Sequence, residues 1–201
     1  MVQIVLATHN KHKQQELALA LADFKHQILS LDDFPQIGEI AETGTTLLEN
    51  SLIKARTVNQ LTGLPAIADD TGLEVDALGG VPGVYSARWA GDNAGYRENN
   101  LKLLTELAEI PADQRSARFR CFISYVDQNL ELWANAKVEG IILKEPVGQA
   151  GFGYDPLFFV PGLNKTLAQL SAEEKNRISH RGLAIQNFRK LFIEKIQPEY
   201  K

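Results

Sequence analysis

The sequence predicts a mixed α/β fold, with parallel pairing near the start of the chain and antiparallel pairing farther along. Residues 3–31 read as strand, helix and strand, which is the order of a β-α-β unit and favours parallel strands. Residues 117–143 read as two strands that return on themselves through a short turn. We therefore expect an elongated mixed sheet flanked by helices and arranged in two lobes.

Length and composition favour one folding unit over residues 1–201. A chain of 201 residues and 22.3 kDa can form one large domain, or two small lobes that share a core. Its 44% apolar and 23% charged residues exclude the disordered, collagen-like and coiled-coil classes. The longest stretch without Asp, Glu, Lys or Arg is residues 57–68, which is too short to cross a bilayer.

Signals of secretion and of nucleic-acid binding are weak. The first residues lack a basic segment and a small-residue cleavage site, and the single cysteine, Cys121, excludes an internal disulfide. Both observations favour a cytoplasmic location. The formal net charge of −4 argues against a protein that coats nucleic acid. We expect neither a nucleic acid nor a membrane as a partner.

The first elements follow from the spacing of apolar residues. Residues 3–7 form a β-branched run typical of a buried strand, and residues 11–24 carry apolar side chains at helical spacing. Residues 26–31 read as the second strand of the unit. A capping box formed by Thr46 and Glu49 then opens a helix that runs to about residue 61.

A third strand is predicted at residues 65–68. It delivers Asp69, Asp70 and Thr71 into a turn, and the glycines and proline of residues 79–83 forbid regular structure just beyond. The remaining elements are predicted from apolar spacing and turn residues. They are a helix at 97–110, strands at 117–126 and 130–143, a Gly-rich turn at 148–156, a strand at 157–160, a capping box at Ser171 and Glu174, and a final helix whose core stripe is Ile185, Phe188 and Phe192.

The turn after the first strand is the first candidate site. Thr8, His9 and Asn10 lie where a strand ends and a helix begins, and backbone N–H groups and the helix dipole attract anions at such a place. Lys11 and Lys13 add positive charge. The alternative is an ordinary helix cap followed by solvated lysines.

Two adjacent carboxylates, Asp69 and Asp70, form the second candidate. Ligands of open α/β sheets bind beyond the carboxyl ends of the strands. Carboxylate oxygens suit Mg²⁺, which keeps several waters and bridges substrate phosphates. Glu42, Glu49 and one of the aspartates could complete the acidic patch. The alternative is that Asp69 caps a turn and Asp70 is solvated.

A third candidate combines aromatic and basic residues. Phe or Tyr can stack on a base, Asp can accept from base N–H groups, and Lys, His and Arg can hold phosphate or a base carbonyl. The alternative is that Phe152 belongs to the core and Arg181 to a surface ion pair. The residues of this candidate are Phe152, Tyr154, Asp155, Lys175, His180 and Arg181.

Several motifs are missing, which disfavours some kinds of active site. The sequence has no P-loop, no complete G-x-G-x-x-G, no His-Glu-x-x-His, no Cys-x-x-Cys and no G-x-S-x-G elbow. Zinc and a serine nucleophile are therefore disfavoured. Cys121 lies in a predicted strand, where a buried structural thiol is favoured over a nucleophile.

Five segments together carry a resemblance to a known family. Their order and spacing resemble those of the Ham1/RdgB family of inosine triphosphate pyrophosphatases, over nearly the whole chain. The segments are ATHNKHKQQE (7–16), ETGTTLLENSLIKA (42–55), AIADDTGLEVDALGGVPGVYSARWAG (66–91), GFGYDPLFF (151–159) and SAEEKNRISHRG (171–182).

The resemblance implies an activity and a fold. It implies hydrolysis of the non-canonical purine nucleoside triphosphates dITP, ITP and XTP to the monophosphate and pyrophosphate, which keeps these nucleotides out of DNA and RNA. It further implies Mg²⁺ as cofactor, a cytoplasmic homodimer, and an elongated α/β fold whose active site lies in a cleft between two lobes.

The resemblance also implies a role for each site residue. Glu42 and Asp70 would place Mg²⁺, and Asp70 would also accept a proton from the attacking water. Ionised at an ordinary pKa of about 3.9, Asp70 would orient the water rather than act as a strong base. Arg181 or Lys175 would donate to the oxygen at purine C6, which adenine lacks. The substrate-binding residues would be Thr8, His9, Asn10, Lys11, His12, Lys13 and Lys54 toward the triphosphate, and Thr71, Phe152, Gly153, Tyr154, Asp155, Lys175, His180 and Arg181 toward the nucleoside.

Two other kinds of protein remain open at this point. A non-catalytic, regulatory nucleotide-binding module would use the same lysines and aromatic residues but would need no acidic metal cluster. A nucleic-acid-processing protein is disfavoured by the net charge of −4 and by the absence of a basic stripe.

Overall fold

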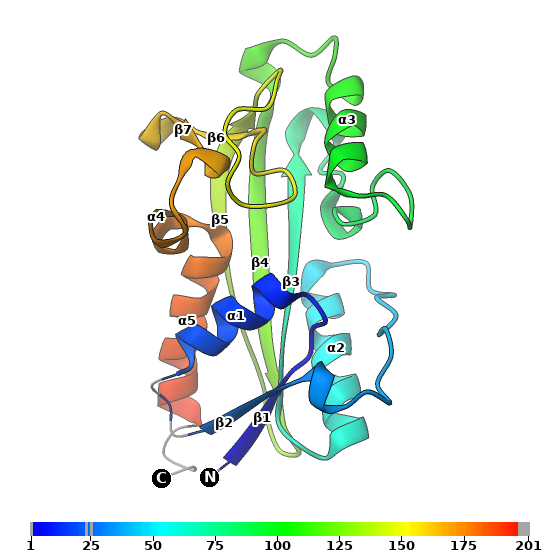
Figure 1. Cartoon of the computed structure of the whole chain (residues 1–201), viewed down its shortest axis with the longest axis vertical. Coiled ribbons are helices and arrows are strands. Elements are labelled where there is room, and N and C mark those ends of the chain that lie inside the picture. Colours follow the sequence, from blue (N-terminus) through cyan, green and yellow to red (C-terminus); the bar gives the residue numbers. More distant parts are fainter. Residues whose placement is uncertain (1, 23, 25, 197–201) are drawn as a thin grey trace. The chain divides into compact units, whose positions relative to one another are not determined.

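A computed structural model of the chain describes residues 2–22, 24 and 26–196 (Figure 1). The strands found there form one sheet in the order β2-β1-β3-β4-β5-β6-β7. The strands are β1 Val2–Leu6, β2 His26–Ser30, β3 Ala66–Val75, β4 Ser116–Val126, β5 Glu131–Ile142, β6 Phe158–Val160 and β7 Lys165–Thr166. The helices are α1 Lys11–Ala20, α2 Leu47–Thr62, α3 Tyr96–Glu106, α4 Ala172–Ile178 and α5 His180–Lys195.

The sheet is mixed, as predicted. Strand β1 pairs in parallel with both β2 and β3, which confirms the opening β-α-β unit. Strands β4 and β5 are neighbours joined by residues 127–130, and so short a connection requires them to run antiparallel. Strand β6 pairs antiparallel with both β5 and β7.

Strand β3 is longer than the sequence indicated. The prediction that Asp69, Asp70 and Thr71 enter a turn is wrong, because the strand continues through them to Val75. Leu73 and Val75 are fully buried, so apolar packing beyond the aspartates extends the strand.

Helices α1 and α3 end earlier than predicted, α3 at Glu106 rather than at residue 110. Helix α1 ends at Ala20 rather than at residue 24. The capping box of Ser171 and Glu174 opens α4, and a separate helix, α5, starts at His180. The division falls at Ser179, whose ψ of 155° is extended rather than helical.

The residues divide into two compact units, in agreement with the two lobes expected. Unit 1 comprises residues 1–70, 121–136 and 184–201, and unit 2 comprises residues 71–120 and 137–183. The chain passes from one unit to the other inside β3, β4, β5 and α5. That residues 1–201 make a single domain stays a prediction.

Unit 1 has helices on both faces of its part of the sheet. Ile4 and Leu6 of β1 pack in one apolar cluster with Leu17 of α1 and Phe188 of α5. The alternate β1 residues, such as Val5, pack in a second cluster with residues of α2. The sides match the period-two alternation of a strand, and Figure 1 shows α1 and α5 on one side of the strands and α2 on the other.

Unit 2 is built around its own apolar cluster. Leu103 of α3 packs with Leu73 of β3, Phe119 of β4 and Phe158 of β6.

In unit 1, the Cys121 side chain is fully buried, which fits a structural thiol. Among the residues described, no helix is both long and apolar enough to span a membrane.

Candidate active site

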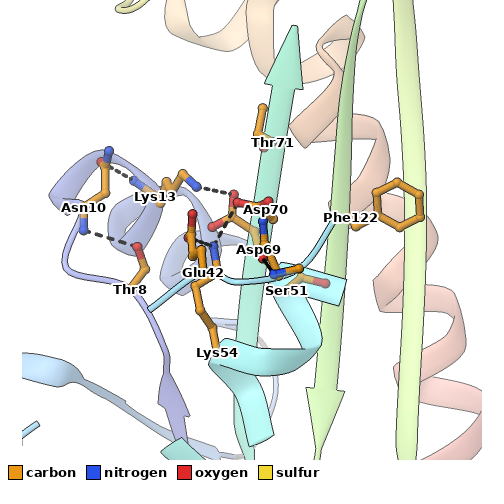
Figure 2. Close-up of polar contacts among 12 residues, drawn as sticks. Thr8, Asn10, Lys13, Glu42, Ser51, Lys54, Asp69, Asp70, Thr71 and Phe122 are labelled. Carbon is orange, nitrogen blue, oxygen red and sulfur yellow. Dashed lines mark hydrogen bonds and ion pairs between the residues drawn. The ribbon is translucent and has the colours of Figure 1, made fainter. Parts of the chain in front are cut away.

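Lys54 lies between two carboxylates of unit 1 (Figure 2). Its Nζ is 2.7 Å from Oε1 of Glu42 and 2.9 Å from Oδ1 of Asp70. Lys54 projects from α2, Glu42 lies in the loop before that helix, and Asp70 lies on β3. Lys54 and Asp70 are buried, with 7% and 6% of their surface exposed, so water screens their charges poorly.

Burial and charge have opposite effects on this group of residues. Burial alone would lower the pKa of Lys54, but the carboxylates of Asp70, Glu42 and Asp69 outweigh it and raise that pKa above its usual range. Burial raises the pKa of Asp70, although the ammonium groups of Lys54 and Lys13 pull it down. An ordinary pKa for Asp70 was therefore the wrong expectation, because the carboxyl is enclosed rather than set in an open turn.

A second lysine pairs with the other aspartate. Nζ of Lys13 lies 3.0 Å from Oδ2 of Asp69, which is completely buried. Lys13 comes from the first turn of α1, so the turn after β1 and the acidic stretch of β3 meet at this ion pair. We call Glu42, Asp69, Asp70, Lys13 and Lys54 the acid–lysine cluster.

The turn after β1 is an ordinary helix cap that also directs Lys13 inward. Oδ1 of Asn10 accepts hydrogen bonds from the backbone N–H groups of His12 and Lys13, and Oγ1 of Thr8 accepts one from the N–H of Asn10. The alternative interpretation of this turn is thus correct for Asn10, while Lys13 is held against Asp69 rather than solvated.

The other predicted residues of this turn face different surroundings. Nε2 of His9 lies 3.2 Å from the carbonyl oxygen of Gly38, and His12 is exposed. Lys11 forms a largely exposed ion pair with Asp32. The structure therefore brings Lys13, but not Lys11, to the acid–lysine cluster.

The loop that carries Glu42 is fastened to α2 by two side chains. Oδ1 of the fully buried Asn50 accepts a hydrogen bond from the N–H of Gly44 at 2.8 Å. Oε2 of Glu49 accepts from the N–H groups of Thr45 and Thr46 at 2.6 and 3.0 Å. Glu49 thus completes the predicted cap rather than joining an acidic patch. Sequence reasoning missed Asn50, whose partner is a backbone group that no motif reveals.

Gly44→Ala is expected to disturb this loop. A Cβ at Gly44 would lie 2.6 Å from Cβ of Glu49 and 2.7 Å from Oδ1 of Asn50, so the loop must shift. Overpacking of this kind costs about 1–3 kcal/mol. Urea denaturation should show that loss, and Gly38→Ala is the matched control because no atom lies within 4 Å of its Cβ position. Equal stability of the two variants would contradict the prediction.

Unit 2 holds a second group of predicted residues, centred on Asp155. Its Oδ2 accepts hydrogen bonds from the N–H of Phe152 at 2.8 Å and from Nζ of Lys175 at 2.5 Å. Asp155 and Lys175 are 2% and 8% exposed. Asp155 therefore anchors the Gly-rich turn and neutralises a buried lysine.

The ring of Phe152 is surrounded by cationic and aromatic groups. Nζ of Lys175 lies 4.7 Å and Cζ of Arg181 5.6 Å from the centre of the ring, within the range of cation–π attraction. Nη2 of Arg181 also makes a long hydrogen bond of 3.4 Å to Oγ1 of Thr71. We call Thr71, Phe152, Asp155, Lys175 and Arg181 the aromatic–basic cluster.

Two neighbours of this cluster were missed by sequence reasoning. The ring centre of Tyr96 lies 6.0 Å from that of Phe152, and Nδ2 of Asn100 donates to the carbonyl of Gly153 at 3.0 Å. Both come from α3 and stand four residues apart, so they lie on the same face of the helix. That spacing was visible in the sequence, but their target was not.

Tyr154 and His180, the last two predicted residues, contact Ser86 and Phe119. The hydroxyl of Tyr154 donates to the carbonyl of Ser86 at 3.0 Å, and burial raises the pKa of Tyr154, so the phenol stays neutral. The ring of His180 stacks on that of Phe119, with 4.6 Å between centres.

The acid–lysine cluster offers carboxylate oxygens suited to a metal. Within residues 2–22, 24 and 26–196, no group of three or more His, Cys, Asp or Glu side chains is placed to hold an ion. Oδ2 of Asp70 is nevertheless buried and has no hydrogen-bond partner among these residues. Because Mg²⁺ takes only one or two carboxylates and fills its shell with water and phosphate, Asp70 and Glu42 fit this metal.

Comparisons with known proteins agree with this architecture. The Ham1 family model matches residues 4–191. The dITP/XTP pyrophosphatase of Shigella flexneri is 49% identical over 189 residues, which cover 92% of this chain and 95% of that protein. The dITP/XTP pyrophosphatase of Vibrio cholerae is 48% identical over 197 residues, with 96% and 98% covered.

Solved structures show the same fold. The HAM1 protein from Coxiella burnetii superposes with a TM-score of 0.91 at 42% identity, and covers 96% of this chain and 100% of its own. The Ham1 protein of Staphylococcus aureus gives a TM-score of 0.87 at 38% identity, with 96% and 98% covered. The predicted α/β class is confirmed.

Proposed function

This chain belongs to the Ham1 family, and we propose on that premise that it hydrolyses dITP, ITP and XTP to the nucleoside monophosphate and pyrophosphate. It is a nucleoside-triphosphate pyrophosphatase, a hydrolase that acts on a phosphoanhydride. The structural observation that carries the mechanism is the buried carboxylate of Asp70, held beside two ammonium groups.

The acid–lysine cluster receives the triphosphate. Lys13 and Lys54 neutralise the negative charge of the phosphates, and the turn of Thr8 and Asn10 supports Lys13. Asp70 orients the attacking water toward the α-phosphorus through its second oxygen, Oδ2, and pyrophosphate leaves. Catalysis of this kind depends on positioning and on charge neutralisation more than on covalent chemistry.

Glu42 and Asp70 hold Mg²⁺ in this proposal. When bound, the cation supplies charge neutralisation at the phosphates and a lower pKa for bound water. The chain contributes the position of both carboxylates, because the clamp of Asn50 and Glu49 fixes the loop of Glu42.

The aromatic–basic cluster receives the purine. Phe152 offers a face for stacking, and Arg181 or Lys175 donates to the C6 oxygen. Adenine has an amine at C6, which would leave that donor unpaired, and an unpaired donor in a buried site is strongly disfavoured. His180, Tyr154 and Gly153 complete the purine-binding residues of this proposal.

Two further properties belong to the same proposal. We expect a homodimer in solution, which light scattering coupled to gel filtration tests, and a cytoplasmic location. Neither nucleic acid nor a membrane is expected as a partner.

A panel of nucleoside triphosphates with Mg²⁺ tests the function. We expect release of pyrophosphate from ITP, dITP and XTP well ahead of ATP and GTP. Release of orthophosphate would indicate a phosphatase instead. Tight calorimetric binding of ITP without turnover would indicate a regulatory nucleotide-binding module.

A further inference from the structure

The acid–lysine cluster is almost neutral without any metal. It holds three carboxylates, of Glu42, Asp69 and Asp70, and the two ammonium groups of Lys13 and Lys54, so its formal charge is −1 when all are ionised. Buried carboxylates need such compensation, because an unpaired buried charge is strongly destabilising.

Lys54 and Lys13 compensate this charge in different ways. Lys54 contacts Glu42 and Asp70, the two residues that would hold Mg²⁺, at distances of 2.7 and 2.9 Å. Lys13 contacts Asp69, which is outside that pair, at 3.0 Å. Lys54 therefore occupies oxygen atoms that a cation would need, whereas Lys13 is held at Asp69.

We propose that Lys54 competes with a divalent ion for Glu42 and Asp70: its ammonium group lies between the two carboxylates, and a divalent ion that binds them displaces it. This inference rests on the proposed function, because it takes these two residues as the metal ligands. A divalent ion on Asp70 repels an ammonium group less than 3 Å from the same carboxylate, and the displaced ammonium is then available to the phosphates.

The position of Lys54 explains why the carboxylates of Glu42 and Asp70 can lie close together before substrate binds. A carboxylate pair without Lys54 would be an open, strongly attractive cation site. With Lys54 in place, a cation that takes Oε1 of Glu42 and Oδ1 of Asp70 as ligands must displace two charge-assisted hydrogen bonds. Lys54 therefore weakens metal binding in the absence of nucleotide. When nucleotide binds, its phosphates become new partners for the ammonium group of Lys54, and metal binding is strengthened.

Mn²⁺ binding to nucleotide-free protein tests the proposal. The free ion is measured by electron paramagnetic resonance with wild type, Lys54→Gln and Lys13→Gln at one ionic strength. Both variants lose one positive charge, but only Lys54→Gln vacates Glu42 and Asp70. We expect Lys54→Gln to bind Mn²⁺ about tenfold more tightly than wild type and at least about threefold more tightly than Lys13→Gln. A smaller margin over Lys13→Gln, or weaker binding, would overturn the proposal.

A second measurement uses the wild-type protein alone. Acetylation of each lysine is followed by mass spectrometry with EDTA and with Mg²⁺. Lys54 reacts slowly while it is paired and buried, and we expect several-fold faster reaction once Mg²⁺ is present. Lys175 is the internal control, because it is equally buried in an ion pair with Asp155 of unit 2. An unchanged rate at Lys54 would overturn the proposal.

Neither measurement depends on turnover. If the protein does not hydrolyse ITP but Lys54→Gln binds Mn²⁺ more tightly as expected, the proposed function is rejected and the displacement of Lys54 is retained. If the protein hydrolyses ITP but Lys54→Gln and Lys13→Gln bind Mn²⁺ equally tightly, the displacement of Lys54 is rejected and the proposed function is retained.

Discussion

Asp70→Asn is expected to lower kcat for ITP about 10³-fold, within the range by which a positioned catalytic group accelerates a reaction. Asparagine has the shape of aspartate and can still accept the hydrogen bond from Lys54 at Oδ1. It cannot supply the negative charge that orients water and holds the cation. Pyrophosphate release at saturating Mg²⁺ and ITP measures the effect.

Asp113→Asn is the control for this variant, because it makes the same chemical change at an exposed residue outside both clusters. It should retain wild-type kcat. An Asp70→Asn enzyme within tenfold of wild type would remove Asp70 from the mechanism.

The pH profile gives a second readout of Asp70. The pKa of this carboxyl is raised above 3.8 by burial, so the ionised, active form is lost at a higher pH than for an exposed aspartate. In kcat/KM, which reports the free enzyme, activity of wild type should therefore fall on acidification at a higher pH than an exposed aspartate would give.

Lys175→Met is expected to destabilise the protein by about 3–5 kcal/mol, because it leaves the carboxylate of Asp155 buried without its partner. The same substitution at Lys137, whose ion pair with Glu139 is half exposed, should cost less than about 1 kcal/mol. Urea denaturation of both variants measures the difference.

A double variant separates charge from packing. Adding Asp155→Asn to Lys175→Met removes the unpaired charge and keeps an acceptor for the N–H of Phe152. It should regain part of the lost stability. If the double variant is less stable than Lys175→Met, the loss comes from packing of the lysine stem and not from an uncompensated carboxylate.

Apolar periodicity was enough to predict most of the architecture. The β-branched run of β1 and the helical spacing of α2 are local patterns, so a buried strand and the apolar face of a helix could be predicted from sequence alone. Strand β3 was cut short because two adjacent aspartates resemble the end of a strand. They lie inside it because Lys13 and Lys54, from two helices, neutralise them. Such compensation depends on tertiary contacts that no local pattern encodes.

The candidate site was predicted as a set of residues rather than as a geometry. A contact of Asp155 with the base stays a prediction, and sequence reasoning did not show that its carboxylate accepts hydrogen bonds from Lys175, twenty residues later, and from the backbone of Phe152. The roles of Asn50 and Asn100 were not predicted either, because each amide pairs with a backbone group that no motif marks: the N–H of Gly44 for Asn50 and the carbonyl of Gly153 for Asn100. The assignment of individual substrate contacts stays a prediction.

The discontinuous make-up of the two units limits how the protein can be dissected. Unit 1 is assembled from three stretches of chain and unit 2 from two, and every boundary falls within a strand or a helix. No single proteolytic cut and no truncation from either end could release one of them intact. Fragment complementation or domain grafting would therefore have to rejoin at least two pieces per unit.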